Sequence, residues 1–146
     1  MRHSENYLGS WRSHLWRRDF LALMATRWGL GDVREVLDVG CGNGHWGFAL
    51  GTALSPDARV VGVDREGGWI DDAREAAEGH GLAGRFTYQT SAAERLPFAD
   101  ASFDMVTCQT VLMHVADPEA VLREMLRVLR PGGLLVAVEP NNLVQS

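Results

Sequence analysis

Apolar positions along the chain fall into short continuous runs that alternate with longer segments of helical spacing. The short runs predict five strands, at residues 34–40, 59–64, 85–90, 102–109 and 134–140. The longer segments predict helices at residues 45–54, 69–78 and 117–130. The last of these helices is expected to begin at Asp117 and Pro118 and to stop at the run Pro131-Gly132-Gly133. Regular alternation of strands and helices favours an α/β fold, with a parallel sheet that carries helices on both faces.

An amphipathic segment precedes the first strand. Residues 10–28 carry large apolar side chains at helical spacing and predict one helix, namely through Trp11, Leu15, Trp16, Phe20, Leu23, Met24 and Trp28. Aromatic side chains in this pattern usually pack against a core. We therefore expect residues 1–30 to form a helical segment that caps a domain of residues 31–146.

Composition limits the classes of protein that fit. A chain of 146 residues, 46% of them hydrophobic, is long enough for one domain with a real core. The net charge of −5, without a basic run, gives no support for nucleic acid as a partner. No long apolar segment predicts a membrane span, and the first residues lack the apolar core of a signal peptide, so we expect a cytoplasmic protein. The two cysteines have no metal-binding spacing.

A glycine-rich stretch follows the first predicted strand. The segment "VLDVGCGNGHWG" covers residues 36–47. In an open parallel sheet, ligands bind outside the carboxyl ends of the strands, and glycines there let backbone N–H groups approach a ligand closely. Asp64 ends the second strand, about twenty residues beyond this loop, where a carboxylate can accept both hydroxyls of a ribose. The competing interpretation of Asp64 is a surface carboxylate or a cap of the next helix.

Two ligand classes fit this much of the pattern. Residues 42–47 spell G-x-G-x-x-G, the motif of dinucleotide oxidoreductases, but this match alone is weak. An adenosyl-containing ligand fits the same loop and the same acidic residue. The rest of the sequence has to decide between these two ligand classes.

Four blocks of sequence resemble the class I S-adenosylmethionine-dependent methyltransferases, in particular the small-molecule branch of ubiquinone and menaquinone methyltransferases. The blocks are "VLDVGCGNG", "VVGVD", "ERLPFADASFDMVTCQ" and "LREMLRVLRPGGLLVAVEP", and the resemblance covers residues 35–140. It implies a Rossmann-like doubly wound parallel sheet of about five strands in the order 3-2-1-4-5. It also implies S-adenosylmethionine as cofactor and a small-molecule methyl acceptor. Two alternatives remain: a cofactor-binding module or subunit without catalysis and, with less support, a nicotinamide-dependent oxidoreductase.

The resemblance assigns roles to individual residues. The backbone at Gly40, Gly42 and Gly44 would pass close to the methionine and ribose parts of the cofactor, and Asp38 would orient the loop or the methionine amine. Asp64 would accept the ribose hydroxyls. Three further residues are expected at the cofactor site: Arg65 alongside the adenine, Gln109 at the methionine end, and Cys41, whose thiol with that of Cys108 could lie near the methyl group. The competing interpretations are a solvated residue at a helix start for Arg65 and, as the more common outcome, two unpaired small residues for the cysteines.

One position departs from the family pattern. After the third strand the family has a Gly-Asp-Ala-Glu stretch, whose aspartate accepts the adenine amino group, whereas this chain has Ser91-Ala92-Ala93-Glu94. The N–H of Ala93 can still serve the adenine, and Ser91 or Glu94 can partly substitute for the missing acid. Loss of one charge-assisted hydrogen bond costs about 1.5–3 kcal/mol. We therefore expect weaker cofactor binding than in a typical relative.

The sequence shows less about catalysis than about binding. Methyl transfer is an in-line displacement, and much of its acceleration comes from holding the acceptor close and aligned, so a general base is optional. Candidates follow the fourth and fifth strands, namely Gln109, Thr110, His114, Glu139, Asn141 and Asn142. His114 is the natural choice because histidine titrates near neutral pH. A buried or capping histidine is the more common outcome in such a segment.

Both ends of the chain raise a further expectation. The N-terminal segment has a second interpretation as a lid, in which Tyr7, Trp11 and Arg12 cover the cofactor and Arg12 pairs with its carboxylate.

The sequence stops at Ser146, shortly after the fifth strand, whereas the family's sheet ordinarily has seven strands. We expect a fragment of a longer enzyme, or a partner that covers the fifth strand. Self-association through this exposed edge would be the physical consequence.

Overall fold

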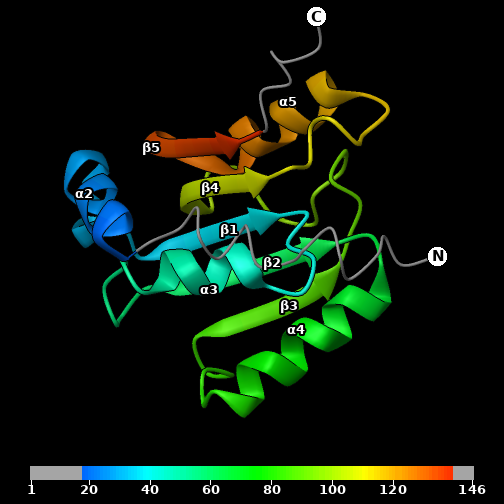
Figure 1. Ribbon diagram of the computed structural model, residues 1–146. Coiled ribbons are helices and arrows are strands. Elements are labelled where there is room, and N and C mark those ends of the chain that lie inside the picture. Colours follow the sequence, from blue (N-terminus) through cyan, green and yellow to red (C-terminus); the bar gives the residue numbers. More distant parts are fainter. Residues whose placement is uncertain (1–17, 140–146) are drawn as a thin grey trace, which may run out of the picture.

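The computed structural model describes residues 18–139, and their five strands form one parallel sheet in the order β3-β2-β1-β4-β5 (Figure 1). The strands are β1 (Glu35–Val39), β2 (Arg59–Asp64), β3 (Phe86–Thr90), β4 (Phe103–Gln109) and β5 (Leu129–Val138). The predicted fold class and strand order are confirmed. The order reverses between β1 and β4, which is where ligands bind in sheets of this kind.

Helices cover both faces of the sheet. They are α2 (Arg18–Trp28), the short 3-10 helix η1 (Leu30–Asp32), α3 (His45–Gly51), α4 (Gly67–Gly79) and α5 (Pro118–Val128). Side chains of α2, α3 and α4 share one hydrophobic cluster with one face of the strands. Those of α5 belong to a second cluster on the other face. The sheet therefore separates two cores, as a doubly wound fold requires.

Alternate residues of the central strands feed the two cores. Val36 and Met105 belong to the cluster on the side of α3, whereas Leu37 and Val106 belong to the cluster on the side of α5. All four are fully buried. A strand that is buried on both faces needs apolar side chains at successive positions, which explains why the sequence shows continuous apolar runs rather than alternation.

Three helix boundaries differ from the predicted ones. The helix expected at residues 45–54 ends at Gly51, and α4 begins at Gly67 rather than at residue 69. The helix expected at residues 117–130 ends at Val128. Only the second half of the helix expected at residues 10–28 lies among the described residues, as α2. No helix of residues 18–139 is long and apolar enough to cross a membrane.

The run Pro131-Gly132-Gly133 lies inside a strand instead of ending a helix. β5 begins at Leu129, opposite Phe103, and the next residue of β4 in the register, Met105, pairs with Leu134. The extra residues form a bulge, in which Gly132 has a φ of +77°. A Cβ atom at Gly133 would lie 2.8 Å from the carbonyl oxygens of Arg130 and Asp104, so only glycine fits this close approach.

A buried hydroxyl joins α3 to the neighbouring strands β4 and β5. The Thr107 side chain is fully buried and accepts a hydrogen bond of 3.0 Å from Nε1 of Trp46. The same hydroxyl donates to the carbonyl oxygen of Val136, at 2.7 Å. The indole N–H of Trp46 and the hydroxyl of Thr107 are thus both hydrogen-bonded, as buried polar groups need to be.

Replacing Thr107 by valine keeps the shape of the side chain and removes the hydroxyl. Because the indole N–H of Trp46 then loses its bond to the Thr107 hydroxyl, the free energy of unfolding should fall by about 1–3 kcal/mol. Urea unfolding followed by circular dichroism measures this change. Thr107→Ser keeps the hydroxyl and loses only the methyl group, so it is the control for a change of side-chain packing at this position. An unchanged unfolding midpoint in Thr107→Val would contradict the role of this hydroxyl.

Candidate functional site

The loop after β1 is built on glycines in the left-handed region. Gly40, Gly42 and Gly44 have φ angles of +67°, +54° and +87°. A Cβ atom at Gly40 would lie 2.4 Å from Cγ2 of Val111, and one at Gly44 would lie 2.8 Å from the Phe48 ring. Backbone angle and space therefore both require glycine at these two positions. Gly44 also begins α3, as its N-cap residue.

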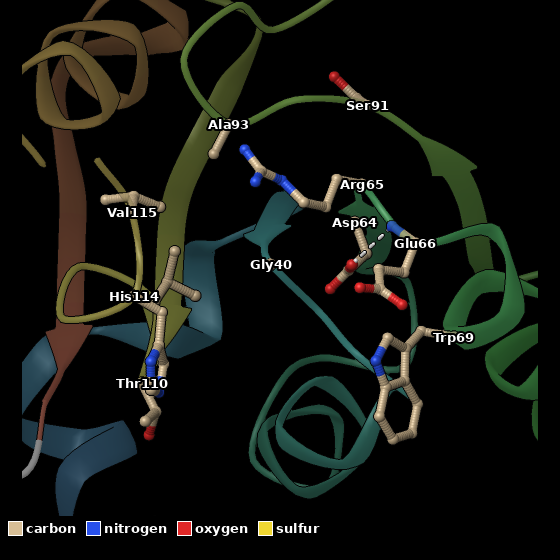
Figure 2. Close-up of a pocket in the computed structure, with 11 residues that line it drawn as sticks. Gly40, Asp64, Arg65, Glu66, Trp69, Ser91, Ala93, Thr110, His114 and Val115 are labelled. Carbon is tan, nitrogen blue, oxygen red and sulfur yellow. Dashed lines mark hydrogen bonds between the residues drawn. The ribbon is translucent and has the colours of Figure 1, made fainter. Parts of the chain in front are cut away.

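Asp64 connects this loop to the end of β2. Its Oδ2 atom accepts a hydrogen bond of 3.0 Å from the N–H of Gly42. Its Oδ1 atom accepts one of 3.0 Å from the N–H of Glu66 (Figure 2). An ionised carboxylate offers about four lone-pair positions, so two of them remain for a ligand.

A cavity of about 320 Å³ opens at the carboxyl ends of the strands, where the sequence predicts the ligand site. Its lining comes from the loops after β1, β2, β3 and β4 and from the start of α4: Gly40, Asp64, Arg65, Glu66, Trp69, Ser91, Ala93, Thr110, Val111, His114 and Val115. Figure 2 shows two opposite walls, one with Thr110, His114 and Val115 and the other with Asp64, Glu66 and Trp69. Gly40 lies between them.

The loop after β3 contributes the upper rim seen in Figure 2. Nη2 of Arg65 lies 3.5 Å from Oε1 of Glu94, which joins the loops after β2 and β3. Ser91 and Ala93 line the cavity, whereas Ala92 is not among the lining residues. The Ser91 hydroxyl donates to the carbonyl oxygen of Ala92, at 3.0 Å. Ser91 and Glu94, the two residues considered as substitutes for the missing acid, are thus both engaged in contacts of their own, with Ala92 and Arg65.

Asp38 lies in β1, beneath the glycine loop, and is 2% exposed. Its Oδ2 atom has no hydrogen-bond partner among the described residues. Burial, with the negative charge of Asp64 as the smaller cause, raises the pKa of this carboxyl to about 8. The group is therefore largely neutral near pH 7 and has an oxygen available to a donor.

A second buried polar atom without a described partner lies close by, the Tyr88 hydroxyl. The Tyr88 ring crosses Gly62, where a Cβ atom would lie 2.5 Å from the ring, and its hydroxyl reaches Gly44. Burial, together with the charge on Cys41 and Asp38 when they are ionised, raises the pKa of the Tyr88 hydroxyl. The glycine loop therefore rests on a tyrosine that sequence reasoning did not single out.

The remaining predicted residues occupy varied positions. Cys41 and Cys108 are free and buried, and they belong to the two different hydrophobic clusters. Burial, with the charge of Glu139 next, raises the pKa of the Cys108 thiol to about 12, so it is not a nucleophile at neutral pH. Gln109 ends β4 but is not among the cavity-lining residues, and Tyr7, Trp11 and Arg12 lie outside the described residues.

Four lining residues were missed from the sequence, namely Glu66, Trp69, Val111 and Val115. Two of them lie before or within the first turn of α4, directly after Asp64. The other two lie in the loop after β4. The usable signal was position alone, because every loop that follows a strand of a parallel sheet reaches the same edge.

Comparison with known proteins identifies the family. A family model described as a methyltransferase domain matches residues 31–146. The ubiquinone/menaquinone biosynthesis C-methyltransferase UbiE of Geobacter sulfurreducens is 38% identical over 124 residues, 85% of this chain and 47% of that protein. A demethylmenaquinone methyltransferase of Geobacillus kaustophilus is 37% identical over 135 residues, 92% of this chain and 56% of that protein.

A solved structure shows that the fold extends beyond these enzymes. The cyclase SpnF superimposes with a TM-score of 0.71 at 30% identity, over 81% of this chain and 43% of that one. The chain spans about half the length of the curated relatives it matches. The family match nevertheless covers most of its residues, including every loop of the cavity. The chain therefore belongs to the class I S-adenosylmethionine-dependent methyltransferases, in the branch of UbiE and the demethylmenaquinone methyltransferases.

Proposed function

We propose that this chain is the cofactor-binding part of a methyltransferase that transfers a methyl group from S-adenosylmethionine to a small-molecule acceptor. The observation that carries the proposal is the position of Asp64, which joins the glycine loop to β2 at the edge of the cavity and keeps two acceptor positions for ribose hydroxyls. Use of S-adenosylmethionine is general in the family. Activity of the 146-residue chain itself is part of the proposal.

The described residues fit the parts of this cofactor. Asp64 would accept the ribose hydroxyls, and the glycine loop at Gly40, Gly42 and Gly44 would approach the ribose and the methionine part. The partnerless oxygen of Asp38, beneath this loop, suits the methionine ammonium group, directly or through a water molecule. Two rim features suit the adenine, namely the guanidinium of Arg65 and the backbone of Ala93 next to Ala92.

The cofactor supplies an electrophilic methyl group on a sulfonium, and the protein has to hold an acceptor in line with it. The wall formed by Thr110, His114 and Val115, opposite Asp64, is the side from which we propose that the acceptor approaches. His114 lines the cavity and is the candidate general base if the acceptor has to lose a proton. Cys41 and Gln109 remain proposed members of the methionine end.

A second candidate function is cofactor binding without methyl transfer. Two observations favour it: Ala92 replaces the acid of the family pattern, and the related cyclase SpnF is named for another reaction. A fold hosts more than one chemistry, so family membership alone does not decide between them. Turnover of an acceptor by this chain would exclude the second candidate.

The first test is calorimetric titration of the chain with S-adenosylhomocysteine, the demethylated product. Asp64→Ala should abolish measurable binding, because it removes the proposed ribose acceptor and the acceptor for the Gly42 N–H. Asp64→Asn should lose about tenfold or more in affinity, since an amide is a weaker acceptor than a carboxylate. Asp57→Ala, a change in the loop before β2, is the matched control. Binding that survives in Asp64→Ala would exclude Asp64 from the site.

A second test uses the protonation of Asp38. Its carboxyl is neutral below about pH 8 in the free protein, and the ammonium group of the ligand favours the ionised form. Binding should therefore release a proton, and affinity should rise between about pH 6 and pH 8. Titrations in buffers of different ionisation enthalpy measure the released proton. Asp38→Asn should abolish the release, and an equal release in that variant would assign the proton to another group.

The outer edge of β5 motivates a further proposal about association. Within residues 18–139, β5 pairs with β4 and no strand pairs with its other edge. We propose that two copies of the 146-residue chain associate through this edge, so that the average mass by light scattering should rise with protein concentration. A mass of one chain at every concentration would contradict this.

Two further expectations from the sequence also remain predictions. They are the division at residue 30 into a helical segment and a domain, and the location in the cytoplasm.

A further inference from the structure

Glu139 directly follows β5 and makes its hydrogen bonds to a different part of the chain. Its Oε1 atom accepts from the backbone N–H groups of Val111 and Leu112, at 2.9 and 3.0 Å. The Cys108 thiol donates to the same oxygen, at 3.8 Å. One carboxylate oxygen therefore accepts hydrogen bonds from Cys108 in β4 and from the second and third residues of the loop that follows.

That loop leaves β4 through a strained residue. Thr110 has a φ of +56°, in the left-handed region that residues other than glycine rarely adopt. Its N–H still donates to the carbonyl oxygen of Val138, at 2.8 Å, so the strand pairing continues up to the bend. Such a conformation persists only where surrounding contacts hold it. The bonds to Glu139 come immediately after the bend and are among the contacts that can do so.

The position of the loop decides the shape of the cavity. Thr110, Val111, His114 and Val115 all line it. Val111 also packs against Gly40, so a displacement of this loop reaches the glycine loop on the other side. Glu139 itself is not among the lining residues.

We propose that Glu139 is a positioning residue, which holds the wall of Thr110 to Val115 at the distance from Asp64 that the cofactor requires. The inference rests on the proposed function of the cavity. It assigns Glu139 a geometric role in place of the general-base role considered from the sequence, because Glu139 does not line the cavity and its Oε1 atom accepts from backbone donors of the wall. Its Oε2 atom is buried and has no hydrogen-bond partner among the described residues. A carboxylate suits this role since charge-assisted hydrogen bonds to backbone N–H groups are short and strong.

Asp104, near the start of β4, provides a matched control at the opposite end of the strands. Its Oδ2 atom also accepts from two successive backbone N–H groups, those of Arg34 and Glu35, at 3.0 and 2.9 Å. It lies before the first pair of β1 with β4 and is not among the cavity-lining residues. Loss of either carboxylate removes two hydrogen bonds to backbone N–H groups, and loss of Asp104 also removes an ion pair with Arg130 at 2.7 Å. A purely structural effect should therefore be at least as large in Asp104→Ala as in Glu139→Ala.

The experiment compares wild type, Glu139→Ala, Glu139→Gln and Asp104→Ala in the full chain. Thermal unfolding establishes a temperature at which all four are folded, and calorimetry with S-adenosylhomocysteine is then done at that temperature. Hydrogen exchange of the Val111 and Leu112 amides, followed by NMR, reports the loop directly. Glu139→Ala should bind about tenfold more weakly and lose protection at these two amides. Glu139→Gln, which keeps an acceptor oxygen, should restore most of both.

The outcomes separate the two proposals. Asp104→Ala should lower stability and leave both readouts as in wild type. Unchanged protection of the two amides in Glu139→Ala, or a Glu139→Gln variant that behaves like Glu139→Ala, overturns the positioning role. Protection lost without any change in affinity overturns it as well. If wild type does not bind S-adenosylhomocysteine, the proposed function fails, while the exchange data still decide whether Glu139 holds the loop.

Discussion

The approach of the loop after β1 to the loop after β4 is the constraint on which the rest of the site depends. Gly40 and Val111 touch so closely that no side chain fits at Gly40. This contact brings the ends of the two central strands together at the point where the strand order reverses. At Gly40 the cavity is thus lined by backbone, and its lining side chains come from the end of β2, the start of α4 and the loops after β2, β3 and β4.

The polar groups around this contact divide into two kinds. Trp46, Thr107 and Val136 form a closed chain of hydrogen bonds inside the core, which contributes to stability and leaves no group for a ligand. Asp38 and the Tyr88 hydroxyl are equally buried but lack described partners. Burial of an unsatisfied polar group opposes folding, so its presence beside a cavity is typical of a site that serves function at the expense of stability.

The sequence predicted the features that depend on local pattern. Strands buried on both faces appear as continuous apolar runs, and the spacing from the glycine loop to Asp64 identified the edge of the sheet at which the cavity opens. Features that depend on distant partners were not predictable. Pro131-Gly132-Gly133 stops helices in a local interpretation, yet pairing with β4 makes it a bulge. The bonds of Glu139 reach residues 27 and 28 positions away, and nothing in the local pattern indicates them.

Two carboxylates, that of Asp104 in β4 and that of Glu139 after β5, also affect the alignment of the sheet. A strand of a parallel sheet can shift by two residues and still present the same side chains to each face, because side chains alternate with a period of two. Asp104 accepts hydrogen bonds from the two backbone N–H groups at the start of β1. Glu139, after β5, accepts hydrogen bonds from two backbone N–H groups just after β4. A shift of β4 by two residues would carry both sets of donors and acceptors out of reach. Among otherwise equivalent alignments of buried apolar strands, these two side chains select one register.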